Sequence, residues 1–176
     1  MSWQTFLLSA DCDFVSHILC SYYGLKLGTS LWMSMHSIEK YLKALLLKND
    51  SSFNPRKYSH RIEELWNKSK DLFPNEYLFQ TPEFDTYILE INNQDKNPDI
   101  RYGFGIDSQE PNCTRIYTMI ACTLRILILG DEEYRKRGNY GISDMCFGGC
   151  NHFFEDPIIS AKEIVIKEVD RLTDLK

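Results

Sequence analysis

The sequence predicts an all-α protein, an antiparallel up-and-down bundle of four to five core helices followed by a C-terminal helix. Three observations support this fold class. Apolar residues recur at intervals of three and four along most of the 176-residue chain, which is the periodicity of helices with one buried face. No segment shows the two-residue alternation, bounded by turn residues, that is typical of strands. Aromatic residues make up 13% of the chain, too many for a sequence that stays disordered.

The first two predicted helices are separated by Gly24 and Gly28. The first begins near Trp3, and its apolar positions are Phe6, Leu7, Ala10, Phe14 and Ile18. The second carries an apolar stripe that covers about 80° of the helix circumference. The residues of this stripe are Leu31, Met35, Ile38, Leu42 and Leu45.

Capping residues place the third and fourth helices. Residues 49–58 are expected to form a loop, and Ser59 is the expected N-cap of a third helix. Residues 71–80 are expected to form a connection, after which Thr81-Pro82 begins a fourth helix, because proline suits the first helical position. The apolar positions of these two helices are Ile62, Leu65, Trp66, Phe84, Tyr87, Ile88 and Ile91.

A long polar loop, residues 92–111, is expected to precede the fifth helix. That helix runs from about residue 113 to 129, with Ile116, Ile120 and Leu124 in the core and Gly130 beyond its end. Asp156-Pro157 opens a last helix. The whole chain, 1–176, is expected to be one domain.

Charge and targeting signals restrict the function. The net charge of −5 disfavours a protein that coats duplex DNA, because its surface would repel phosphates. The N-terminal residues lack the basic region of a signal peptide, and the apolar stretch 116–129 is interrupted by Arg125 and too short to span a bilayer. We therefore expect a cytoplasmic protein with no membrane association.

The segment 40–61 is unusually basic. It contains six basic residues and one acid, a local charge of +5 in a chain whose total is −5. Lysines near a helix end form a solvated surface in many proteins, whereas a cluster of this kind also suits a phosphate. Glu39, at the border of the apolar stripe, has Lys43 one turn further on. Glu39 and Lys43 either form a surface ion pair, or the Glu39 carboxylate faces inward and needs a hydrogen-bond donor there.

Three segments in this order resemble a HEPN domain (higher eukaryotes and prokaryotes nucleotide-binding). They are HSIEKYLKALLLK at 36–48, SHRIEELW at 59–66 and IRYG at 100–103. The resemblance covers about residues 6–129 and leaves 130–176 as a C-terminal extension. It implies a helical bundle that forms a homodimer, binds a nucleotide or RNA, and often works beside a minimal nucleotidyltransferase or in a toxin–antitoxin pair.

The residues carried over by this resemblance are Glu39, Lys43, His60, Arg101 and Tyr102. We expect Glu39, His60 and Arg101 to meet in one groove, although Glu39 lies about 13 Å down its helix from the loop. Ribonucleases of the family carry an Arg followed by a His after four to six residues, and that motif is missing here. The sequence therefore favours binding without catalysis. A noncanonical ribonuclease and a pure protein-interaction bundle remain the alternatives.

A second cluster, Cys146, Cys150 and His152, lies outside the resemblance. A closed structural zinc site needs four ligands, and the usual C-x-x-C spacing is missing. No metal and no cofactor is expected from the sequence.

Overall fold

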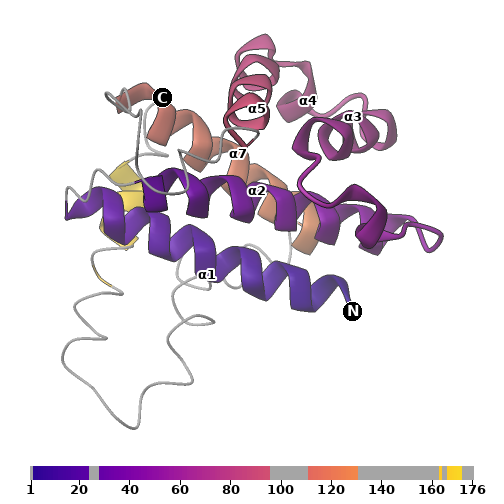
Figure 1. Ribbon diagram of the computed structural model, residues 1–176, viewed down its shortest axis with the longest axis horizontal. Helices are drawn as coiled ribbons and strands as arrows, with labels where there is room; N and C mark the ends of the chain where they lie inside the picture. The colour runs from indigo at the N-terminus through magenta and orange to yellow at the C-terminus, as the bar shows by residue number, and fades with distance from the viewer. Residues whose placement is uncertain (1, 24–27, 96–110, 131–162, 164–165, 172–176) are drawn as a thin grey trace, which may run out of the picture.

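The computed structural model describes residues 2–23, 28–95, 111–130, 163 and 166–171 (Figure 1). Within these residues all regular structure is helical, which confirms the predicted all-α class. The elements are α1 (Trp3–Tyr22), α2 (Gly28–Asn49), the 3-10 helix η1 (Pro55–Tyr58), α3 (Ile62–Leu72), α4 (Tyr77–Gln80), α5 (Pro82–Asp95) and α7 (Pro111–Leu129).

Helices α1 and α2 form a hairpin whose two helices run in opposite directions (Figure 1). Their polar contacts show this direction, because residue numbers fall along one helix as they rise along the other. The imidazole of His17 on α1 lies 2.9 Å from the carbonyl oxygen of Ser30 on α2. Nearer the start of α1, Lys40 donates to Asp13 at 2.5 Å.

Helix α2 lies at the centre of the bundle, packed against α1, α3 and α7. The predicted apolar stripe of α2 is buried at Met35, Ile38, Leu42 and Leu45, while the side chain of Leu31 lies outside the described part. Of the three predicted core positions of α7, Ile120 and Leu124 are buried, whereas Ile116 is only partly buried. The other predicted core positions that are buried are Leu7, Ala10, Phe14, Ile18, Ile62, Leu65, Trp66, Phe84, Tyr87, Ile88, Ile91, Ile120 and Leu124.

A buried charge network joins α1, α2 and α7. The Arg125 guanidinium on α7 donates to both carboxylate oxygens of Asp11 on α1, at 3.0 and 3.3 Å. Tyr41 on α2 donates its hydroxyl to Asp11 at 2.6 Å. Because all three side chains are inaccessible to solvent, this network fixes the middle of α2 relative to its two neighbours.

The start of α3 differs from the prediction. The helix begins at Ile62 with Arg61 at the N-cap position, and no side chain caps it. Ser59 was the expected cap, but the chain uses residues 59–61 to turn, with His60 in the left-handed region at φ 55°. Helix α5 begins at Pro82, as predicted, and a single helical turn, α4, lies within the expected connection.

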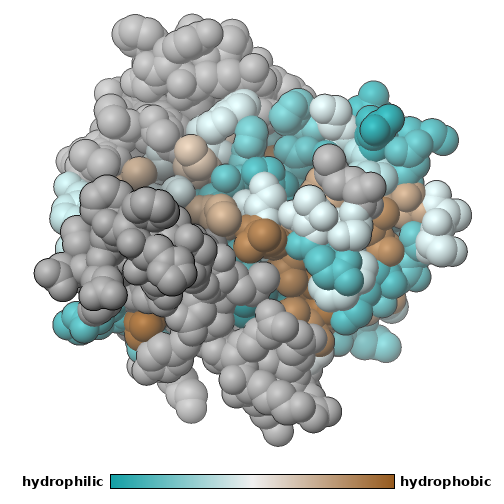
Figure 2. Space-filling view, turned by 90° about the horizontal axis from the view of Figure 1, so that it is seen from below, coloured by the Kyte–Doolittle hydropathy of each residue, from teal (hydrophilic) through white to brown (hydrophobic). Residues whose placement is uncertain are grey.

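The face shown in Figure 2 carries apolar side chains among hydrophilic ones. The exposed large hydrophobic residues in the N-terminal part of the chain are Leu8 and Tyr22 of α1 and Tyr23, which follows the end of the helix. No described helix is long and apolar enough to cross a membrane. The predicted loop 92–111 is wrong at both ends, because α5 continues to Asp95 and α7 already begins at Pro111. Residues 96–110 and the Cys146–Cys150–His152 cluster lie outside the described residues, and the predicted last helix is described only at 163 and 166–171.

Candidate functional site

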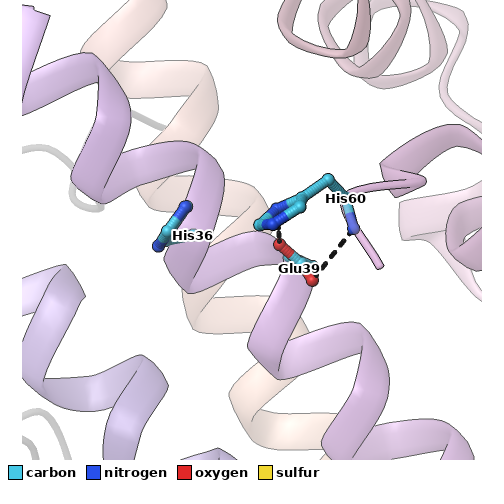
Figure 3. A group of neighbouring side chains, drawn as sticks. All are labelled: His36, Glu39 and His60. Carbon is cyan, nitrogen blue, oxygen red and sulfur yellow. Dashed lines mark hydrogen bonds and ion pairs between the residues drawn. The ribbon is translucent and has the colours of Figure 1, made fainter. Parts of the chain in front are cut away.

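Two histidines and a glutamate come together on the surface of α2 (Figure 3). His36 and Glu39 are three residues apart on the helix, so their side chains leave neighbouring positions of one face. His60 arrives from the turn between η1 and α3 and lies over Glu39. The ligand atoms of the three side chains all lie within 4.8 Å of one another.

The carboxylate of Glu39 is the centre of this group. One oxygen, Oε1, accepts a hydrogen bond from the ammonium group of Lys43 and another from the backbone N–H of His60 at 3.4 Å. The other oxygen, Oε2, lies 3.2 Å from Nδ1 of His60. Glu39 and Lys43 are both buried, so of the two interpretations left open by the sequence, the structure supports the inward carboxylate with its own donors.

The chain returns to Glu39 because the loop after α2 folds back along the bundle. Phe53 in this loop is buried in the core and its ring stacks on Tyr58 of η1 at 5.2 Å between centroids. The positive φ of His60 then turns the backbone so that both its N–H and its imidazole face Glu39. The predicted proximity of Glu39 and His60 is therefore confirmed, despite the distance of Glu39 from the helix end.

Aromatic rings line the same site. The ring of His36 lies 4.1 Å from Trp32 and 5.7 Å from the ring of His60, centroid to centroid, and the two imidazoles are inclined by only 28°. Burial lowers the pKa of His36, although the charge of Glu39 opposes the shift. Nε2 of His36 is buried and has no hydrogen-bond partner within the described part of the chain.

Two lysines of the basic segment that precedes His60 are neutralised by ion pairs, and a third is held by a backbone carbonyl. Lys40 pairs with Asp13, and Lys43 with Glu39. Lys48 donates to a backbone carbonyl of α7.

Three exposed cations of this segment lie close to His60 in the chain. Arg56 and Lys57 are exposed on η1, while the exposed Arg61 pairs with Glu64. Of the predicted site residues, Arg101 and Tyr102 lie outside the described part. Among the predicted and neighbouring cations, Arg56 and Lys57 are therefore accessible to a ligand, whereas Lys43 is buried.

Sequence reasoning missed two members of this group, His36 and Trp32. Their spacing could have indicated that they share a face with Glu39, since residues 32, 36 and 39 follow one another at intervals of four and three along α2. The helix position alone did not show that His60 would cover them.

The arrangement has three chemical possibilities. Two imidazoles and a carboxylate can bind a divalent metal, can transfer protons, or can present rings and N–H groups to an anionic ligand. In comparisons with known proteins, no family model, curated protein or solved structure matches this chain. The function must therefore be inferred from the site itself.

Proposed function

We propose that the protein binds a phosphate-bearing ligand, a nucleotide or RNA, at the surface formed by Trp32, His36, His60 and η1. The observation that carries this proposal is the cluster of three aromatic rings, one of which, His60, follows the exposed basic residues of η1 by only three and four positions in the chain. Nucleobases stack on aromatic and imidazole rings, and each stacked base contributes about 1–3 kcal/mol. The exposed guanidinium of Arg56 provides forked donors for a phosphate, and Lys57 adds a second positive charge.

A carboxylate beneath the site is compatible with an anionic ligand here. Lys43 and the backbone of His60 both donate to Glu39, so its charge is balanced inside the bundle. Lys43 therefore acts by neutralising Glu39 and not by touching the ligand. Arg101 and Tyr102, which the HEPN resemblance also implicates, are proposed to complete the site.

Ribonuclease activity is a second candidate, favoured by one observation. His36 and His60 are close enough to act as an acid–base pair, and Glu39 orients the imidazole of His60. Lowering of the His36 pKa by burial keeps this imidazole neutral near pH 7, as a general base requires. Gel analysis of labelled RNA after incubation separates cleavage from binding.

Fluorescence anisotropy of labelled RNA tests the binding proposal. We expect saturable binding that weakens as salt rises, because phosphate contacts release counterions. Replacing both Arg56 and Lys57 by alanine should weaken binding and flatten the salt dependence. The matched control is Lys167→Ala, which removes an exposed lysine from the C-terminal helix. The double variant removes two charges and the control one, so a loss of binding free energy in the double variant that is only about twice that in the control would show that binding depends only on total charge.

A binding-deficient His60→Asn variant locates the ligand more closely. Asparagine tolerates a positive φ, so this substitution removes the imidazole without imposing backbone strain. We expect weaker binding with little loss of stability, because the side chain of His60 is 48% exposed. Unchanged affinity in this variant would place the ligand elsewhere.

The expected assembly belongs to the same proposal. The HEPN resemblance implies a homodimer, a minimal nucleotidyltransferase partner and a toxin–antitoxin role. The cytoplasmic location is proposed from the sequence. Light scattering tests the dimer, for which the exposed Leu8 and Tyr22 of α1 and the following Tyr23 offer apolar surface. A single chain mass across a wide concentration range would exclude it.

A further inference from the structure

We propose that His36, Glu39 and His60 form a binding site for a divalent transition-metal ion such as Zn²⁺. The donor set is two imidazoles and one carboxylate, a combination that zinc accepts while keeping further positions open. This inference goes beyond the proposed function, because metal binding requires no nucleotide or RNA.

The spacing of the donor atoms fits a common ion. Two ligands that are each about 2.1 Å from zinc lie about 3.4 Å apart at a tetrahedral angle. Nδ1 of His60 and Oε2 of Glu39 are 3.2 Å apart, so this pair already has the required separation. The ligand atoms of the group are separated by up to 4.8 Å, so the longest separation must shorten by about 1.4 Å to reach the tetrahedral value. The longer separations in the group involve His36, because the pair of Glu39 and His60 is already close, so rotation of the His36 side chain supplies that movement.

The surroundings of the ligands also fit a metal site. Lys43 binds Oε1 of Glu39, so the carboxylate is oriented from behind while Oε2 faces His60. Lys40, the other lysine near His36, is paired with Asp13 and adds no net charge. The ring of His36 packs against that of Trp32, 4.1 Å between centroids, on the same face of α2.

His36 gives an independent observation. Its Nε2 atom is buried and unpartnered within the described residues, which is uncommon for a polar atom in a folded protein. A small reorientation of this ring toward Glu39 and His60 would give the group a third metal ligand. The other candidate ligands of the chain, Cys146, Cys150 and His152, belong to a separate segment and can be tested apart.

Zinc titration of the full-length, reduced protein by calorimetry tests this site. We expect one binding event, and His60→Asn should lower its affinity at least about tenfold. Removing a group that only supports a metal ligand already costs about that much, and His60 is itself a proposed ligand. His36→Gln should weaken it to a similar extent. The matched control replaces both Cys146 and Cys150 by serine and should leave the event unchanged. Circular dichroism establishes that each variant is folded, and His60→Asn remains informative if His36→Gln does not fold.

Cobalt provides a second measurement that distinguishes the ligands. Co²⁺ bound by nitrogen and oxygen should give visible absorption without the near-ultraviolet thiolate-to-metal charge-transfer band. His60→Asn should remove this visible absorption. Three results would overturn the proposal: no saturable binding, binding unaffected by both histidine variants, or binding lost in the double serine variant. RNA binding measured with a chelator present tests the proposed function separately, so the two can fail independently.

Discussion

Replacing Arg125 by methionine should destabilise the protein by about 3–5 kcal/mol, because Asp11 loses its cation while staying in the core. Both side chains have no exposed surface, so water cannot solvate the carboxylate in place of the guanidinium. Methionine fills part of the space that the arginine side chain occupies, which keeps the effect of a cavity small. The predicted loss is therefore mainly electrostatic.

Two companion variants apportion this loss. Tyr41→Phe removes one hydrogen bond to the Asp11 carboxylate and should cost about 1.5–3 kcal/mol. The double variant Asp11→Leu/Arg125→Met removes both charges and should be more stable than Arg125→Met alone, because no unpaired charge remains in the core.

Urea unfolding, followed by far-ultraviolet circular dichroism, measures the free energy of unfolding of each variant. A loss below about 1 kcal/mol for Arg125→Met, the value typical of exposed ion pairs, would refute the buried network. A double variant as unstable as the single one would show that the lost packing, and not the orphaned charge, determines the effect.

Three other predictions concern the core. Leu42→Ala should cost about 2–5 kcal/mol, because this side chain is completely buried, and an unchanged urea midpoint would contradict the packing. Burial lowers the pKa of His17 from 6.5 to about 4, so the unfolded chain binds the extra proton between these values. The free energy of unfolding should therefore fall by up to about 3 kcal/mol as pH drops through this window, and His17→Gln should reduce that slope. Burial raises the pKa of Cys122 to about 12, so a thiol reagent should modify the exposed Cys12 in the folded protein and Cys122 only after unfolding, as mass mapping would show.

The fold class and most core positions were predictable because apolar residues spaced at intervals of three and four mark the side of each helix that is buried. The stripe on α2 illustrates this, since burial of Met35, Ile38, Leu42 and Leu45 follows directly from their spacing. The N-terminus of α3 was not predictable from cap preference. Its start depends on where the preceding loop must turn to bring His60 to Glu39, which is a tertiary contact.

The candidate site was predictable only in part. The border position of Glu39 on α2 left a surface ion pair and an inward carboxylate both open, and only the structure decides between them, whereas the proximity of His60 to Glu39 was predicted. The contribution of His36 was missed, because a helical wheel gives the direction of a side chain and not the loop that covers it. The partner of Arg125 could not be found from local spacing, since Asp11 is 114 residues away in the chain.

Nuclear magnetic resonance of the imidazole groups tests most directly whether a phosphate-bearing ligand binds beside His36 and His60. The chain has only four histidines, and His17 is a buried internal control on α1. We predict that titration with a nucleotide or short RNA, with a chelator present, shifts the imidazole signals of His36 and His60 and leaves those of His17 in place. Unmoved signals of His36 and His60 at ligand concentrations that saturate the anisotropy assay would contradict the claim.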